Sequence, residues 1–236
     1  MTGWSVTTLS LHGNWPPSTV AFRFRVPGYG SRLTDHGLSQ VRVDVGLESC
    51  DILRRKSMKL ETVSVRYSRE EDIPAIAAIY AHHVLNGTGS FETAPPDADE
   101  MARRHSAITA KGLPYLVAEF QGVVVAYAYA DLYRTRVAYR HTLEDSIYIH
   151  PDFTGKGIGR LLLGELLSQC ERAGCRQMIG IIGDSANRPS IRLHESLGFA
   201  RVGALFSVGF KFGRWLDVVF MQRALGSGNT KMPGNT

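Results

Sequence analysis

Hydrophobic and polar positions follow two periods between residues 63 and 225. Alternation at period two and short apolar runs predict strands, whereas apolar residues spaced three and four apart predict helices. The predicted strands are 63–67, 115–120, 123–133, 142–149, 177–182, 201–210 and 215–223, and the predicted helices are 69–85, 97–111, 160–173 and 187–197. This order, β-α-α-β-β-β-α-β-α-β-β, predicts one α+β domain with a mixed sheet and helices on both faces.

Local signals support several of these boundaries. Ser68 followed by Glu71 predicts a capping box at the start of the first helix. Pro74 falls in the first turn of that helix, where its missing N–H is harmless. Gln121-Gly122 predicts a two-residue hairpin turn between two strands.

Residues 146–163 form the most informative stretch of the sequence. An alternating β-branched and aromatic run ends at Pro151, three glycines follow at alternate positions (Gly155, Gly157 and Gly159), and an apolar helical pattern begins at Arg160. A strand, a glycine-rich loop and a helix N-terminus together present unpaired backbone N–H groups and a positive dipole end to an anion. The pattern therefore predicts a site for a phosphate-bearing ligand.

The spacing leaves several phosphate ligands and one simpler interpretation to weigh. A nucleotide triphosphate loop needs Ser or Thr after its Lys, and Lys156 has neither. A dinucleotide site needs a third glycine where Arg160 stands, although Asp184 could serve as its ribose-binding acid. The loop could also be a glycine-rich turn that binds nothing.

Three motifs resemble the GCN5-related N-acetyltransferase (GNAT) superfamily. Gly157 and Gly159 match the fixed positions of its Gln/Arg-x-x-Gly-x-Gly/Ala loop, while Thr154 replaces the usual Gln or Arg. Residues 187–199 resemble its Asn-x-x-Ser…His-Glu-x-Leu-Gly-Phe/Tyr block, and residues 208–220 resemble the closing motif of its phosphinothricin and methionine sulfoximine acetyltransferase subgroup. The resemblance covers residues 63–225 and implies the GNAT fold, with a mostly antiparallel sheet.

The resemblance implies acetyl-CoA as co-substrate and direct transfer to an amine. Glu144 would be the catalytic base, although a strand glutamate can equally point to solvent. His194 would lie near the thiol and could protonate it, although a satisfied structural histidine is as good an interpretation. The residues implied to hold acetyl-CoA are Ile147, Tyr148, Ile149, Thr154, Gly155, Lys156, Gly157, Ile158, Gly159, Arg160, Asn187 and Ser190.

The acceptor is expected to be a small amino acid with an acidic head. Arg134 and Arg136, with Tyr139 close by, suit a carboxylate or phosphinate because guanidinium groups bind such anions bidentately. By resemblance, Phe91 and Glu92 close over this substrate. Two alternatives stay open: acetylation of a protein N-terminus or another amine, and a non-catalytic acyl-CoA sensor.

Composition limits the remaining possibilities. Residues 1–57 hold seven Lys/Arg against four Asp/Glu, so most of the net charge of +5 lies outside the main domain and does not indicate nucleic-acid binding. We expect 1–57 to be a poorly ordered extension, 58–225 to be the acetyltransferase domain and 226–236 to be a disordered tail. Three cysteines (Cys50, Cys170 and Cys175) are expected to be core thiols of a cytoplasmic protein, with no metal site and no membrane span. The resemblance also implies a homodimer.

Overall fold

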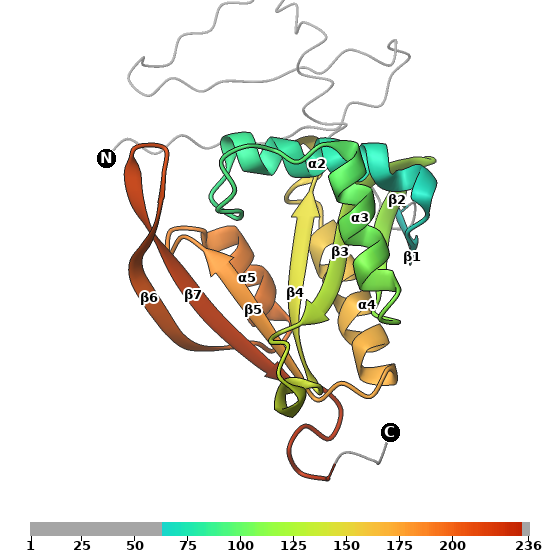
Figure 1. The fold of residues 1–236 in the computed structure, drawn as a ribbon, viewed down its shortest axis with the longest axis vertical. Helices are drawn as coiled ribbons and strands as arrows, with labels where there is room; N and C mark the ends of the chain where they lie inside the picture. The colour runs from blue at the N-terminus through green and yellow to red at the C-terminus, as the bar shows by residue number, and fades with distance from the viewer. Residues whose placement is uncertain (1–62, 233–236) are drawn as a thin grey trace, which may run out of the picture. The chain divides into compact units, whose positions relative to one another are not determined.

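The computed structural model describes residues 63–232, which form a seven-stranded sheet and four α-helices (Figure 1). The predicted extension 1–57 lies outside the described residues. The strands are β1 (Val63–Tyr67), β2 (Tyr115–Phe120), β3 (Val123–Leu132), β4 (Thr142–Ile149), β5 (Gln177–Gly183), β6 (Ala200–Lys211) and β7 (Arg214–Ala224). The helices are α2 (Ile73–Asn86), α3 (Ala98–Thr109), α4 (Ile158–Arg172) and α5 (Arg188–Ser196). The predicted order of elements and the α+β class are confirmed.

The sheet has the strand order β1-β2-β3-β4-β5-β7-β6, and β4 and β5 are its one parallel pair. Their pairing is short: it begins at Thr142 opposite Gln177 and ends at Asp145 opposite Gly180. Beyond that point β4 continues to Ile149 along β3, and β5 continues to Gly183 along β7. The two central strands therefore diverge, which opens the sheet near its middle.

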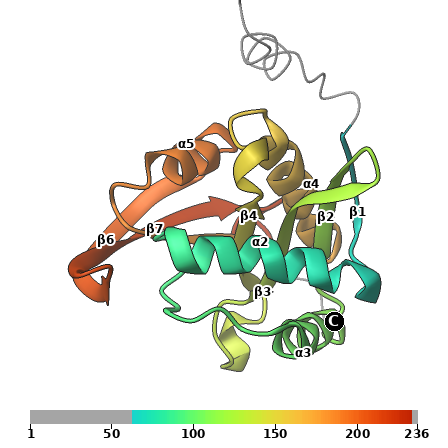
Figure 2. The ribbon, with the colours of Figure 1, turned by 90° about the horizontal axis from the view of Figure 1, so that it is seen from above.

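Helices cover the sheet on two sides (Figure 2). On the front, α2 and α3 pack on β2 and β3 around a cluster that includes Ile76, Val84 and Tyr127. On the back, α4 packs on β2 and β3 through a larger cluster that includes Leu163 and Leu166. Fully burying such a leucine stabilises a fold by about 1.5–3 kcal/mol, so the α4 face is a main source of stability.

Helix α4 shows how the sequence pattern becomes a packed face. The apolar residues predicted to share one side of this helix are all at most 2% exposed; they are Leu162, Leu163, Leu166, Leu167 and Cys170. The helix begins at Ile158 rather than at the predicted Arg160, because Gly157 adopts a left-handed conformation (φ 83°) that ends the loop there.

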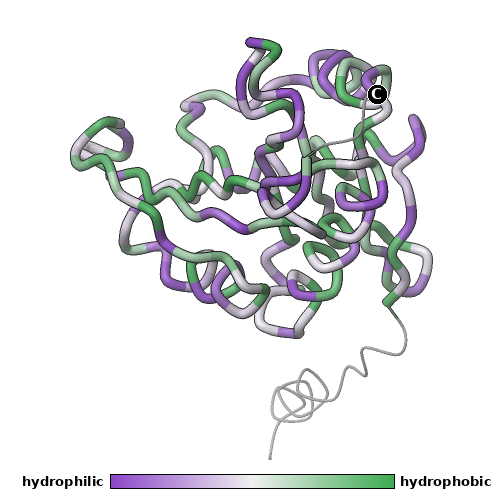
Figure 3. The backbone as a smooth tube through the Cα atoms, turned by 90° about the horizontal axis from the view of Figure 1, so that it is seen from below, coloured by the Kyte–Doolittle hydropathy of each residue, from purple (hydrophilic) through white to green (hydrophobic). Residues whose placement is uncertain are grey.

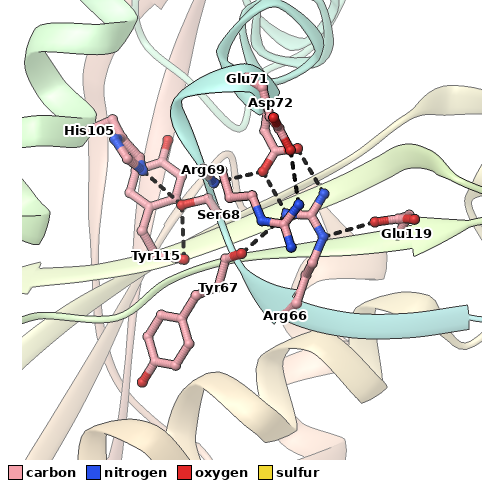
Figure 4. Close-up of polar contacts among 9 residues, drawn as sticks. All are labelled: Arg66, Tyr67, Ser68, Arg69, Glu71, Asp72, His105, Tyr115 and Glu119. Atoms are coloured by element: carbon pink, nitrogen blue, oxygen red, sulfur yellow. Dashed lines mark hydrogen bonds and ion pairs between the residues drawn. The ribbon is translucent and has the colours of Figure 1, made fainter.

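The predicted capping box at Ser68 is wrong. Ser68 Oγ instead donates to the carbonyl of Tyr115 and lies 2.8 Å from His105 Nε2 (Figure 4). The residue that caps the turn is Asp72, whose carboxylate accepts from the N–H of Arg69 at 2.7 Å and from both terminal nitrogens of Arg66. The Arg66 guanidinium holds the Asp72 carboxylate through two hydrogen bonds, and this pair stabilises the short 3₁₀ turn Glu70–Asp72 that precedes α2.

Two further local predictions have different outcomes. The two-residue turn at Gln121-Gly122 is confirmed. Both residues have positive φ (52° and 79°), as a type I′ hairpin turn requires. The disordered tail expected from Gly226 stays a prediction, although hydrogen-bonded turns occur at its start. Gly228 N–H donates to Leu225, Thr230 N–H donates to Ser227, and Arg176 contacts the Ser227 hydroxyl.

The two cysteines within the described residues lie in the core. Cys170 and Cys175 are buried free thiols, as predicted, and Cys50 lies outside the described residues. None of the helices within residues 63–232 is long and apolar enough to cross a membrane. The β6–β7 hairpin projects from the sheet with hydrophobic positions along it (Figure 3).

Candidate active site

A cavity of about 700 Å³ occupies the opening between β4 and β5. Its walls come from both sides of the sheet. From the back they include Ile149, Leu193 and the glycine loop before α4, and from the front they include His83 and Tyr148. The cavity therefore passes through the sheet, from the N-terminus of α4 on the back to α2 on the front. We call it the slot.

The glycine loop gives the back end of the slot its anion-binding character. Gly157 caps α4 in the left-handed region, so the N–H groups of Ile158 and Gly159 precede the first intrahelical hydrogen bond, which Arg160 N–H donates to Gly157. A Cβ on Gly159 would come within 2.9 Å of the Ile149 side chain and within 3.2 Å of Leu193. With glycine at this position, the helix start approaches the strand and α5 without displacing the ends of these two side chains. The result is a shallow cradle of amides backed by the helix dipole.

Helix α5 forms another wall. Asn187 caps it as predicted: Asn187 Oδ1 accepts from Ser190 N–H at 3.3 Å, and Asn187 Nδ2 donates to the Gly183 carbonyl at 3.4 Å. Both groups of the amide are thus used to tie α5 to the end of β5. Asn187 and Ser190 also line the slot.

His194 lines the slot as a fully hydrogen-bonded side chain. It is 2% exposed, its Nδ1 lies 2.8 Å from the Ser190 carbonyl, and its Nε2 lies 3.0 Å from Asp145 Oδ2. Because a carbonyl only accepts, Nδ1 carries a proton and the couple shares one more proton between Nε2 and the carboxylate. Burial lowers the pKa of His194, but the hydrogen bond and charge of Asp145 outweigh it, so the net pKa is raised.

Glu144 lies next to this couple in sequence but on the other face of the sheet. Successive side chains of a strand alternate, and Asp145 contacts α5 on the back, so Glu144 faces the front. Burial raises the pKa of Glu144; the charge of Arg134 works against this, and Asp145 and Asp131 add to it. A carboxylate with a raised pKa is suited to accept a proton near neutral pH.

The predicted acceptor residues do not line the slot. Arg134 stacks on the Tyr133 ring at 4.2 Å, and its positive charge lowers the pKa of Glu144 against the larger effect of burial. Tyr139 lies edge-on to Tyr133 and lines a second hollow on the front of β5, β7 and β6. Arg136 is exposed at the start of a short 3₁₀ turn.

Phe91 and Glu92 belong to the loop between α2 and α3. Glu92 pairs with Arg104 of α3 at 2.7 Å. The Phe91 ring packs on two glycines, Gly183 at the end of β5 and Gly209 in β6, where any Cβ would collide with it. This loop therefore lies on the front, where its first residues, Gly87 to Gly89, line the slot.

Most of the residues predicted to hold the cofactor meet at the slot. Lys156 and Ile158 do not: Lys156 Nζ lies over the Phe153 ring, and Ile158 is 1% exposed in the core. The predicted residues that line the slot are Ile147, Tyr148, Ile149, Thr154, Gly155, Gly157, Gly159, Arg160, Asn187, Ser190 and His194. Sequence reasoning missed Asp145, whose pairing with His194 depends on contacts between distant segments and leaves no local signal.

Comparison with known proteins identifies the family of the chain that forms this slot. The model of the acetyltransferase (GNAT) family matches residues 76–199. The chain belongs to this family. It is 55% identical over 170 residues to a phosphinothricin N-acetyltransferase of Alcaligenes faecalis, covering 72% of this chain and 86% of that protein. It is 40% identical over 163 residues to an L-methionine sulfoximine/L-methionine sulfone acetyltransferase of Salmonella typhimurium, covering 69% of this chain and 95% of that protein.

A solved structure supports the same assignment for this acetyltransferase. A phosphinothricin acetyltransferase of Sinorhizobium meliloti, in complex with acetyl-CoA, is 47% identical and superposes with a TM-score of 0.72, covering 74% of this chain and 94% of that one. The acetyltransferase uses acetyl-CoA as its co-substrate. The residues present fit this molecule, because the amide cradle before α4 suits a diphosphate and the slot leads from it through the sheet.

Proposed function

We propose that this acetyltransferase acetylates the α-amine of a small amino acid of the phosphinothricin or methionine sulfoximine and sulfone type. The proposal is supported by the relatives that carry those names and by the front-facing Glu144 at the point where β4 and β5 diverge. The divergence carries most of the argument. It opens a passage from the anion cradle on the back to Asp145, and the half-buried Glu144, which does not itself line the slot, is the adjacent residue on the front.

Glu144 acts as the general base. The last β4–β5 pair, Asp145 with Gly180, marks the closed end of the slot, and Glu144 is the adjacent residue on the front. The α-amine of a free amino acid is more basic than a peptide N-terminus, whose ordinary pKa is about 7.7–8, because the neighbouring carboxylate favours the ammonium; it is therefore almost fully protonated at neutral pH and must lose that proton before it attacks. Glu144 accepts it, directly or through a water, and acetyl transfer is direct within a ternary complex.

The back of the slot holds the acetyl-CoA arm and stabilises the departing thiolate. The loop amides up to Gly159, which precede the first intrahelical hydrogen bond, bind the diphosphate, and α5 contributes the wall formed by Asn187 and Ser190. His194 and Asp145 share one proton at the closed end. In this proposal the couple places that proton and the imidazolium charge beside the sulfur as negative charge develops there.

The acceptor lies on the front. Arg134, which interacts with Glu144, binds the acidic head together with Arg136 and Tyr139, and the loop carrying Phe91 and Glu92 closes over the side chain. This arrangement favours an anionic small molecule over a polyamine, which would need acidic partners.

A thiol-release assay tests the substrate class. Acetyl-CoA is offered with a panel of ordinary L-amino acids, phosphinothricin, methionine sulfoximine, methionine sulfone, spermidine and a peptide with a free N-terminus. We expect turnover with the amino-acid analogues at a kcat/KM at least about 100-fold above that for spermidine or the peptide. Preference for the peptide would redirect the assignment to protein N-termini, and acetyl-CoA binding without turnover on any amine would indicate a sensor.

We further propose that the enzyme is a cytoplasmic homodimer that pairs through the β6–β7 hairpin. Its reduced core thiols suit a reducing compartment. The hairpin exposes the large apolar side chains Val202, Leu205, Phe206, Val208, Phe210, Phe212 and Trp215. Large apolar side chains that are exposed together on one element favour a protein interface there. Analytical ultracentrifugation should give a dimer that Phe206→Ser weakens at least about tenfold, since Phe206 is 74% exposed and aromatic anchors dominate interfaces; a monomeric wild type would refute the pairing.

A further inference from the structure

Lys211, at the end of β6, is a buried lysine that the proposed mechanism does not use. It is 5% exposed, and its Nζ donates to the carbonyl of Gly87 at 2.9 Å and to the carbonyl of Ser90 at 2.8 Å. Its Nζ also lies 4.9 Å from the centre of the Phe212 ring. A buried ammonium is expensive unless hydrogen bonds replace its lost water, and two backbone carbonyls do so here.

The carbonyls belong to the loop between α2 and α3, 121 or more residues away in sequence. Ser90 is the centre of this loop. Its hydroxyl lies 2.9 Å from the Tyr80 hydroxyl and accepts from the N–H of Glu92 at 3.2 Å, and Glu92 is held in turn by Arg104. The loop is therefore tied to α2 and α3 on one side, and Lys211 ties it to the C-terminal hairpin on the other.

This loop borders the front end of the slot. Gly87, Thr88 and Gly89 are among the lining residues, and the Thr88 carbonyl packs so closely on Gly183 that a Cβ there could not fit. The amide cradle is on the back, so a change in the loop alters the front opening while leaving the cradle in place. Lys211 itself does not line the slot.

We propose that Lys211 is a positioning residue that fixes the Gly87–Glu92 loop against the end of β5 and thereby sets affinity for the amine acceptor. The inference rests on the proposed function, because it takes the front of the slot as the acceptor side. Lys211 touches neither co-substrate. It acts by holding the backbone that carries Phe91 and Glu92, and its loss would release one side of that loop.

The first test compares Lys211→Met with Arg201→Met, an exposed basic residue on the same strand. Each lost hydrogen bond from a charged donor corresponds to roughly a tenfold factor in an equilibrium. We expect Lys211→Met to raise KM for the acceptor by about tenfold or more, while kcat and the calorimetric Kd for acetyl-CoA change by less than about threefold. Amide hydrogen exchange in residues 87–93 should become faster, whereas Arg201→Met should leave all four measurements unchanged.

A second variant separates loop positioning from general destabilisation. Lys211→Ala removes three carbons and the ammonium, which propylamine can replace, whereas 1-propanol supplies the same length without the charge. We expect propylamine, but not 1-propanol, to lower the acceptor KM of Lys211→Ala toward the wild-type value, with the acetylated amino acid counted by mass spectrometry.

Several outcomes would overturn the inference. Unchanged acceptor KM and unchanged exchange in 87–93 would do so, as would an equal loss of acetyl-CoA affinity, which would indicate global disruption. A wild type inactive on every amino acid would refute the proposed function instead. The exchange measurement, made on the protein without ligand, would still decide whether Lys211 holds the loop.

Discussion

Replacing Glu144 with Gln removes the proposed base and keeps the size and hydrogen-bonding capacity of the side chain. Glu144 lies beside Asp145 at the closed end of the slot and does not itself line it, so the change should test the chemical step and leave the slot in place. Loss of a positioned general base lowers a rate by about 10²–10⁴-fold. Glu144 is partly exposed and water can replace it in part, so we expect the low end, a kcat reduced about 100-fold at pH 7, or about 2.7 kcal/mol in the barrier.

The dependence on pH distinguishes this loss from a structural one. In the wild type, rate should rise as Glu144 ionises, with a limb above the ordinary glutamate range because burial raises its pKa. In Glu144→Gln the amine can lose its proton only to solvent. Below the pKa of the amine its neutral fraction rises about tenfold per pH unit, so the variant should recover at least roughly tenfold between pH 7 and pH 9.

Steady-state thiol release from pH 5 to pH 9.5, with calorimetric binding of acetyl-CoA, measures both effects. Acetyl-CoA should bind to Glu144→Gln as it does to the wild type, and exposed Glu195→Gln on α5 is a matched control. A folded-state pKa above the unfolded value means that stability falls as pH rises through that window, so Glu144→Gln should also raise Tm at neutral pH. Unchanged turnover, or a tenfold weaker Kd for acetyl-CoA, would refute the assigned role.

Two other substitutions test the back of the slot. Gly157→Ala places a Cβ at φ 83°, which introduces a strain of about 1–2 kcal/mol. We expect Tm to fall and the calorimetric Kd for acetyl-CoA to rise at least about tenfold. The control is Gly203→Ala, whose new Cβ meets nothing within 4 Å and should change neither quantity. Asp145→Asn breaks the buried couple with His194 and should cost about 3–5 kcal/mol of stability in denaturant titrations. Because the folded pKa of His194 is raised, the couple's stabilisation is complete below the unfolded pKa of about 6.5 and is lost as pH rises through the folded value, so the cost should shrink toward alkaline pH. A cost independent of pH would contradict the shared proton.

The candidate site could be anticipated where its chemistry comes from consecutive backbone. The glycine loop could be predicted from the sequence because a positive φ at Gly157 and a close approach at Gly159 both favour glycine, and these glycines are neighbours in the chain. The N-cap role of Asn187 was readable for the same reason. The capping box was wrong because the Ser68 hydroxyl bonds the carbonyl of Tyr115, 47 residues away, and Asp72 rather than Glu71 accepts from the backbone of the turn.

The acceptor side shows the opposite case. Arg134 and Tyr139 were identified by residue type, but their stacking with Tyr133 and their distance from the slot walls appear only once β3, β4 and the hairpin are assembled. The hold of Lys211 on Gly87 and Ser90 joins segments more than a hundred residues apart. A lysine in an aromatic hairpin gives no hint of it.

The sequence by itself determined the order of elements, the buried face of α4 and the anion-binding loop, because these depend on periodicity and on backbone conformations that few residues allow. Only the tertiary structure decided that β4 and β5 diverge after Asp145, that Glu144 and Asp145 look to opposite faces of the sheet, and that His194 has no free ring nitrogen. These features arise from pairing between segments distant along the chain. Such pairing is set by the packing of the whole sheet, and no window of neighbouring residues encodes it.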